Sequence, residues 1–168
     1  VVQKLQFDSG RAQVAQWRAA HVAVVDAPAV DVLHVSGDVT IDPGNDLTLD
    51  LTYRVRARAR HEALMFTLNP NLEPSRISLG GSPAEFTFSA GVLTVAEALS
   101  PGQEAELNFV ISGSPDPTFG YLDSTLDLFS GSMMDSQVGI LGYDVSLNRS
   151  GYVALMPGGY WMPTAGPA

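Results

Sequence analysis

The stretch HEALM, residues 61–65, is the part of the sequence whose residue types come nearest to known chemistry. In the H-E-x-x-H zinc motif, two histidines four residues apart reach one metal ion from the same face of a helix, and the glutamate acts as a general base. Here Met65 stands where the second histidine is required. The other histidines, His21 and His34, lie too far away along the chain for a local metal site. We therefore predict no zinc site and interpret His61 as a loop residue.

Carboxylates and small loop residues give no stronger signal of catalysis. Asp123, Asp127 and Asp135 share one stretch, but they lack the dense D-x-D-x-D-G spacing that surrounds a calcium ion. We interpret this stretch as a solvated acidic loop. The sequence also contains no G-x-S-x-G elbow, no P-loop and no dinucleotide fingerprint. An enzyme that acts alone is disfavoured, because no convergent set of catalytic residues can be assembled.

Four arginines in the stretch TYRVRARAR, residues 52–60, could bind phosphates, but the overall charge opposes this. The chain has 18 acidic and 9 basic residues and a net charge of -9, and such a surface repels a polyanion. A strict alternation of apolar and polar residues starts at Leu47 and predicts one long half-buried strand up to Arg60. The arginines then occupy its solvated face, beside Glu104 and Glu106 of a second alternating strand. No nucleic-acid partner is expected.

The fold that positions these residues is predicted to be mostly β. The chain is 168 residues long and 45% hydrophobic, which suits one domain with a core, and 16 glycines and 11 prolines divide it into short segments. Many strands without interleaved helices are typical of an antiparallel β-sandwich. One short helix is expected before the sheet, over residues 10–21 with Ser9 as its N-cap.

The strand pattern divides the chain into three parts. Besides the long strand, we expect strands at 31–35, 37–41, 64–68, 76–79, 85–88, 92–95, 104–111, 138–147 and 152–156. The parts are a helical or extended lead-in (1–29), a β-sandwich domain (30–156) and a linker (157–168). The sequence has no cysteine and no apolar run near the roughly 20 residues of a membrane span, so neither disulfides nor direct membrane insertion is expected. Because Val1 is not a natural start, we expect a piece of a longer protein.

The order of the segments resembles a known family. The run LTLDLTYRVRARARHEALMFTLNPNLEPSRISLGG, followed by EFTFSAGVLTVAEALSPGQEAELNFVISGSP, is similar to the amino-terminal domain of aminopeptidase-N-type zinc metallopeptidases, the gluzincin aminopeptidases. That domain shows the same progression of a long amphipathic strand, a hairpin, an aromatic strand and a strand that leads into a variable loop. The closing YVALMPGGYWMPTAGPA is similar to the segment by which bacterial membrane-tethered and transporter-linked relatives leave this domain. The resemblance covers residues 30–168.

The resemblance implies a saddle-shaped sandwich that braces a catalytic domain and walls part of its substrate channel. The family's zinc motif and exopeptidase strand belong to the next domain, so zinc is expected there and no cofactor is expected in this chain. The implied partners are the downstream catalytic domain of the same polypeptide and peptide substrate at the channel wall. The parent would be a bacterial, extracytoplasmic or membrane-tethered metallopeptidase, or an inactive relative. The fragment itself would be soluble and not an enzyme.

Two places in the sequence are candidate functional sites. In some family members this domain holds the free amine of the substrate through an acidic or amide side chain shortly before the final strand, and Asn148 in SLNRSGYVAL is nearest to that place. An ordinary turn residue is the alternative interpretation. Tyr160, Trp161 and Met162 lie among prolines and glycines, which weaken backbone pairing, and large apolar groups in such a segment generally mark an interface. We expect them to contact the catalytic domain, with Trp161 accessible and Trp17 shielded.

A second function fits the same fold class. A free-standing β-sandwich on a bacterial surface could bind carbohydrate or protein. A sugar-binding sandwich needs a coplanar row of Trp or Tyr on one solvated face, whereas the outward face of the long strand carries Arg and Thr. The sequence therefore favours the non-catalytic, channel-forming domain of a larger metallopeptidase-like protein.

Overall fold

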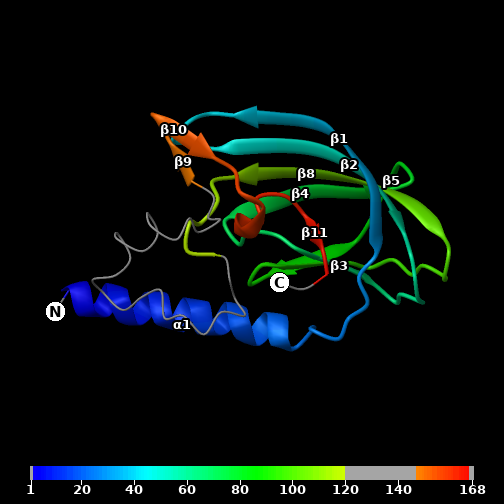
Figure 1. Ribbon diagram of the computed structural model, residues 1–168, viewed down its shortest axis with the longest axis horizontal. Helices are drawn as coiled ribbons and strands as arrows, with labels where there is room; N and C mark the ends of the chain where they lie inside the picture. Colours follow the sequence, from blue (N-terminus) through cyan, green and yellow to red (C-terminus); the bar gives the residue numbers. More distant parts are fainter. Residues whose placement is uncertain (1, 120–146, 167–168) are drawn as a thin grey trace.

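Two antiparallel sheets pack face to face in the computed structural model, which describes residues 2–119 and 147–166 (Figure 1). The larger sheet has the order β1 (Asp31–Ile41), β2 (Leu47–Arg56), β8 (Glu104–Gly113), β4 (Leu72–Leu79) and β5 (Ser82–Pro83). The smaller sheet has the order β11 (Thr164–Ala165), β3 (Leu64–Thr67), β7 (Val92–Val95) and β6 (Phe86–Ser89). A separate hairpin joins β9 (Leu147–Arg149) to β10 (Tyr152–Ala154). The predicted all-β antiparallel sandwich is confirmed.

Strand β2 lies between β1 and β8 in the larger sheet and shows which side chains enter the core. Its burial alternates along the whole strand, with Leu47 and Leu49 at 0% exposure and Arg54 and Arg56 exposed. Arg54 lies opposite Glu106 and Arg56 opposite Glu104 of β8, so the predicted pairing of a basic with an acidic outer face is confirmed. The strand ends at Arg56 instead of Arg60: the Ala57 amide still donates to the Gln103 carbonyl at 2.9 Å, and the chain then bends at residues 58 and 59.

Three aromatic rings join the two sheets at the centre of the core. Tyr53 of β2 and Phe109 of β8 meet edge to face with ring centroids 5.1 Å apart. Phe66 of β3 meets Phe109 at 5.2 Å and Tyr53 at 6.4 Å, again edge to face. Such pairs contribute about 0.5–1.5 kcal/mol each beyond the area they bury. The triad therefore fixes how the smaller sheet lies on the larger one.

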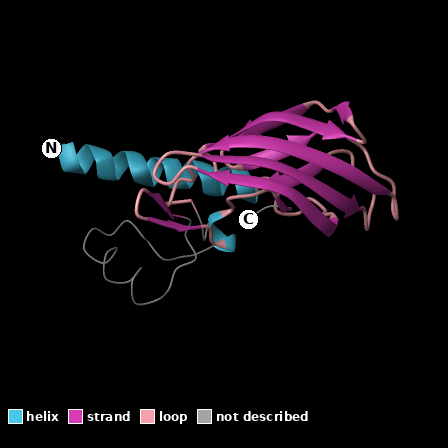
Figure 2. Ribbon diagram, turned by 90° about the horizontal axis from the view of Figure 1, so that it is seen from above, coloured by secondary structure: helices cyan, strands magenta, loops and turns pink. Residues whose placement is uncertain are grey.

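Helix α1 (Val2–Val22) precedes the sandwich and is longer than predicted. It runs through Ser9, so the expected N-cap there is wrong; the residues before Ser9 include neither Gly nor Pro and can extend the helix. Trp17 anchors its second half, being 3% exposed and edge to face with Phe119 at 5.1 Å. The amino-terminal end of α1 extends beyond the sheets (Figure 2). No helix of the described chain has the length and apolar character needed to cross a bilayer.

Strand β1 replaces two shorter predicted strands, because Gly37 does not interrupt it. Gly37 lies opposite Leu51 in register, and a β-bulge falls instead between Val32 and His34. Gly37 has a φ of 141°, and a Cβ there would come within 2.0 Å of the Asp50 carbonyl oxygen, so only glycine fits. The predicted strand 138–147 lies outside the described residues except for its last position. The three aspartates of the predicted acidic loop also lie outside them.

Candidate functional site

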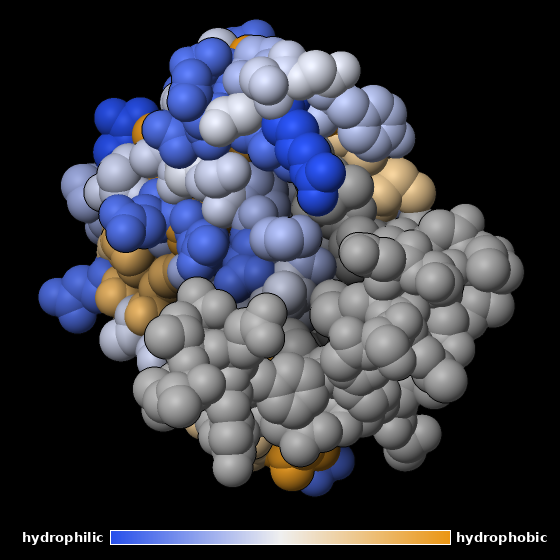
Figure 3. All heavy atoms as spheres, turned by 90° about the vertical axis from the view of Figure 1, so that its left-hand side faces the viewer, coloured by the Kyte–Doolittle hydropathy of each residue, from blue (hydrophilic) through white to orange (hydrophobic). Residues whose placement is uncertain are grey.

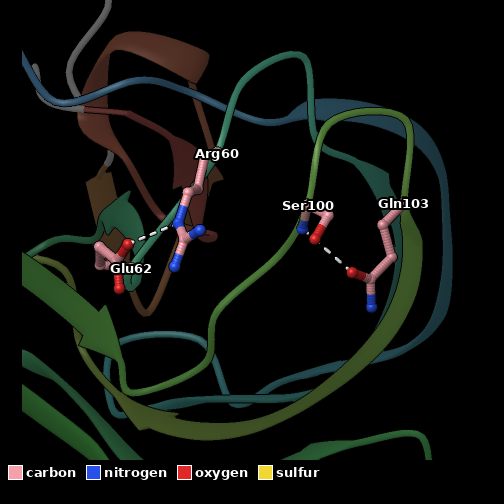
Figure 4. A network of polar contacts seen from close by, with 4 residues as sticks. All are labelled: Arg60, Glu62, Ser100 and Gln103. Atoms are coloured by element: carbon pink, nitrogen blue, oxygen red, sulfur yellow. Dashed lines mark hydrogen bonds and ion pairs between the residues drawn. The ribbon is translucent and has the colours of Figure 1, made fainter.

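The side chains of His61 and Glu62, the residues that begin like the zinc motif, differ greatly in exposure. His61 is 1% exposed, and its backbone forms an isolated bridge with Leu99, with the His61 amide donating to the Leu99 carbonyl at 2.9 Å. Glu62 is 78% exposed and accepts a 2.8 Å hydrogen bond from Nε of Arg60 (Figure 4). The loop interpretation of His61 missed this burial.

The bridge at His61 brings the β2–β3 loop alongside the turn that precedes β8. In that turn the Ser100 amide donates to Oε1 of Gln103 at 3.0 Å (Figure 4). These contacts hold the β2–β3 loop and the turn before β8 in place. Among the residues that the structure describes, no three His, Asp or Glu side chains converge on a common point that could hold a metal ion. The described residues therefore offer no zinc site of the kind that the family resemblance places in the parent protein.

The arginine face of the larger sheet is balanced by carboxylates of the same sheet. Asp31 of β1 accepts from Arg58 at 2.6 Å and lies 3.7 Å from Arg56. The hydrogen bond from Arg58 lowers the pKa of the Asp31 carboxyl below its usual range. The side chain of Arg58 is 77% exposed, so solvent strongly screens this ion pair. This face is therefore a solvated, internally paired surface.

Asn148 lies on β9 and holds the turn that connects β1 to β2. Its Oδ1 accepts from the Gly44 amide at 2.9 Å, and its Nδ2 donates to the Asn45 carbonyl at 3.2 Å. The turn approaches closely, since a Cβ on Gly44 would come within 2.8 Å of the Ser150 amide nitrogen. Both polar groups of Asn148 thus have structural bonds. A role in holding a substrate amine stays a prediction for this residue.

A polar pocket of about 490 Å³ opens beside the same turn, where β2 and β4 begin and β8 ends. Its lining consists of Asp46, Pro70, Asn71, Glu73, Ser112, Gly113 and Ser114. Gly113 makes this convergence possible: it pairs with both flanking strands, and a Cβ there would come within 2.4 Å of the Asn71 carbonyl. The described surface at this end of the molecule is predominantly hydrophilic (Figure 3). Two carboxylates in a polar pocket can attract a cationic group.

The carboxyl-terminal segment is bonded to the sandwich along most of its length. Strand β11 pairs with β3, and the Thr67 hydroxyl donates to the Gly166 carbonyl at 2.8 Å. The buried Tyr53 hydroxyl donates to the Pro163 carbonyl at 2.9 Å, and burial raises the pKa of that phenol. Regular backbone pairing in this segment is limited to the two residues of β11 and the adjacent Gly166 amide, which donates to the Met65 carbonyl at 3.0 Å. A connection from here to a further domain stays a prediction.

The three residues expected at a domain interface are partly buried within this chain. Trp161 and Met162 pack against the main core. Tyr160 follows the 3-10 helix η1 (Pro157–Gly159), adopts a left-handed φ of 49°, and meets the ring of Phe119 edge to face at 5.7 Å. Trp17 is more shielded than Trp161, in the expected order. Only the outer parts of these three side chains remain for another partner.

Asn69 organises this region, although no motif in the sequence singles it out. It is 0% exposed. Its Nδ2 donates to the carbonyls of Asp116 at 2.9 Å and Gly159 at 3.1 Å, while its Oδ1 accepts from the Asp116 amide at 2.7 Å. Its own amide donates to the Tyr160 carbonyl at 2.9 Å. A short polar residue before a proline was the only local signal, and it does not reveal partners 47 and 90 positions away.

An antiparallel sandwich with this arrangement also occurs within zinc metallopeptidases of the M1 class. A mutant M1 zinc metallopeptidase from Deinococcus radiodurans matches with a TM-score of 0.60 and 19% identity, over 84% of this chain and 30% of that chain. A two-domain M1 zinc metallopeptidase mutant bound to L-tryptophan matches with a TM-score of 0.59 and 22% identity, over 81% of this chain and 29% of that one.

The likeness to these proteins is one of fold. No protein-family model and no curated protein sequence matches the chain. The chain spans 29–30% of the length of the two solved proteins. The match therefore does not assign the peptidase activity of these proteins to this chain.

Proposed function

We propose that this chain is the non-catalytic, amino-terminal β-sandwich domain of a larger aminopeptidase-type zinc metallopeptidase or of an inactive relative. The observation that carries the proposal is the match of 84% of this chain to only 30% of an M1 zinc metallopeptidase at a TM-score of 0.60. The order of strand types in the sequence supports the same assignment independently. In this proposal zinc belongs to a catalytic domain in the rest of the parent, with which the outer parts of Tyr160, Trp161 and Met162 make contact.

The end of the larger sheet with the polar pocket is the part we propose as the channel wall. Asp46 and Glu73 supply negative charge there, which would attract the protonated amine of a peptide. Asn148 lies behind the same turn and holds it in place through Gly44 and Asn45. The domain thus contributes shape and charge to the channel, and no reacting group.

The parent protein is proposed to be bacterial and extracytoplasmic, tethered to a membrane or linked to a transporter. The support is the likeness of YVALMPGGYWMPTAGPA, residues 152–168, to the segment by which such relatives leave this domain. The alternative of a sugar-binding module has less support. Among the described residues Tyr152, at 63% exposure, is the one large aromatic side chain that stands well exposed, and one ring does not make a binding row.

The first test is the coding sequence that follows Ala168. We expect it to encode H-E-x-x-H with a glutamate further downstream. The longer protein should then cleave an aminoacyl-anilide, and this chain alone should not. An unrelated downstream domain, or turnover by this chain alone, would refute the proposal, and specific binding of a soluble oligosaccharide would favour the surface-module function instead.

The channel role is tested in the longer protein by removing the pocket charges. Asp46→Asn with Glu73→Gln should raise KM for a peptide with a free amine and change kcat little, because only binding loses attraction. Glu85→Gln is the matched control, since Glu85 is exposed next to β6 on the other sheet. Equal effects of the control and the pocket variant would exclude this end of the sheet from the channel.

A further inference from the structure

Strand β1 forms one edge of the larger sheet. It is 11 residues long, and within the described chain it pairs only with β2, as its place at the outer edge of the sheet shows (Figure 1). Val39 and Ile41 near its end are 40% and 39% exposed. A long edge with exposed β-branched side chains is a template for pairing with another strand. A β-bulge between Val32 and His34 limits the regular part of this edge to the residues that follow it.

The register with β2 assigns each residue of this edge to a face. Val39 lies opposite Leu49, and Ile41 opposite Leu47, so both valine and isoleucine point to the core side of the sheet. The next residues on that side are Gly37, opposite Leu51, and Val35, opposite Tyr53. The side chains of Ser36, Asp38 and Thr40 point to the solvated side. The apolar side chains are exposed because they overhang the core at the sheet margin.

The order of residue types along the edge is symmetric about Gly37: a polar residue flanks it on each side, followed by a valine. When two copies of β1 lie antiparallel with glycine opposite glycine, Val35 of each copy faces Val39 of the other. Ser36 then faces Asp38, whose carboxylate can accept from the serine hydroxyl. We propose that two copies of this chain associate by antiparallel pairing of their β1 edges about a two-fold axis at Gly37. The two larger sheets then become one continuous sheet.

The residue types on the edge favour this register over its neighbours. A register centred on Asp38 places the two Asp38 carboxylates directly opposite each other, which destabilises a strand pair. A register centred on Ser36 places Val35 opposite Gly37, so the contact between Val35 and Val39 is lost. The register about Gly37 avoids the carboxylate pair and keeps this apolar contact. A two-fold axis also makes every favourable contact occur twice. The proposal is independent of the peptidase-related function.

Disulfide cross-linking tests the register, since the chain contains no cysteine of its own. Ser36→Cys with Asp38→Cys places each new thiol opposite one of the partner copy, and oxidation should yield a covalent dimer. Ser36→Cys alone should not cross-link, because its two thiols then lie diagonally, beyond the roughly 7 Å between Cα atoms that a disulfide spans. Thr87→Cys with Ser89→Cys is the matched control, with the same spacing on the exposed edge strand β6 of the other sheet.

Sedimentation equilibrium tests the association itself. The mass should rise with concentration from 17.8 kDa towards twice that value. Val39→Lys should weaken the dimer about tenfold or more, because a charge replaces an apolar contact at two symmetric places. Thr40→Lys changes the neighbouring residue on the solvated face and should leave the dimer intact; circular dichroism checks that both variants fold. A strictly monomeric chain, a dimer that survives Val39→Lys, or cross-linking by Ser36→Cys alone would each overturn the proposal.

Discussion

Replacing Asn69 by Ala should destabilise the chain more than any other single change to a turn residue. Asn69 is fully buried, and its side chain makes four hydrogen bonds: two from Nδ2 to the Asp116 and Gly159 carbonyls, and two to Oδ1 from the Asp116 and Asn71 amides. Three are between 2.7 and 3.1 Å and the fourth is 3.3 Å. Alanine removes all four and supplies no replacement for the buried groups left behind.

The magnitude follows from these bonds. A hydrogen bond in a folded protein contributes about 0.5–1.5 kcal/mol net, and a buried group left unpaired costs about 1–3 kcal/mol. We therefore expect the free energy of unfolding to fall by about 2–5 kcal/mol. Asn71→Ala is the matched control: the same residue type stands two positions on, its side chain is exposed, and only its backbone amide takes part. Its effect should stay within about 0.5 kcal/mol.

Urea unfolding followed by tryptophan fluorescence measures both variants on one scale. Trp161 reports on the segment that Asn69 ties down through Gly159 and Tyr160. We expect Asn69→Ala to lower the midpoint and also to expose Trp161 further before global unfolding. If Asn69→Ala and Asn71→Ala lost equal stability, the assignment of Asn69 as the residue that anchors the carboxyl-terminal segment would be wrong.

Four other predictions test the faces, the helix and the chemistry. Arg54→Thr should change the free energy of unfolding by no more than about 1 kcal/mol and Leu49→Ala should cost roughly 2–5 kcal/mol, because only Leu49 is in the core; equal losses would show misassigned faces. Burial lowers the pKa of His21, so the folded chain binds fewer protons than the unfolded one, and stability that is complete above about pH 6.5 should decline as the pH falls. Melting curves should show a smaller decline for His21→Asn. Acrylamide should quench Trp161 in Trp17→Phe more than Trp17 in Trp161→Phe, since Trp17 is 3% exposed; equal quenching would contradict this. Elemental analysis of the dialysed chain should find no zinc, and one tightly held zinc per chain would disprove the interpretation of His61.

Features with a local period were predictable from the sequence. The alternation of buried and exposed residues in β2 does not depend on the details of the sandwich, because it requires only that successive side chains point to opposite faces of the sheet. The charged pairing of Arg54 with Glu106 followed from the same rule applied to two strands. The end of β2 at Arg56 was not predictable, since Ala59 continues the alternating pattern although the backbone has already turned away. At Gly37 the sequence predicted a break between two strands, whereas β1 continues through it. The lack of a side chain at Gly37 allows the close approach to β2.

Features that depend on contacts between distant residues left no such pattern. The bond from Tyr53 to Pro163 joins residues 110 positions apart, and Asn148 reaches Gly44 across 104 positions. The composition of MPGGYWMPTAGPA predicted a linker because prolines and glycines weaken regular pairing in isolation. In the folded chain a short strand and a few side-chain donors are enough to hold it, since β3 offers a free edge beside the core. The sandwich therefore extends at least to Gly166, and a following domain in the proposed parent would pack against a surface that already contains β11.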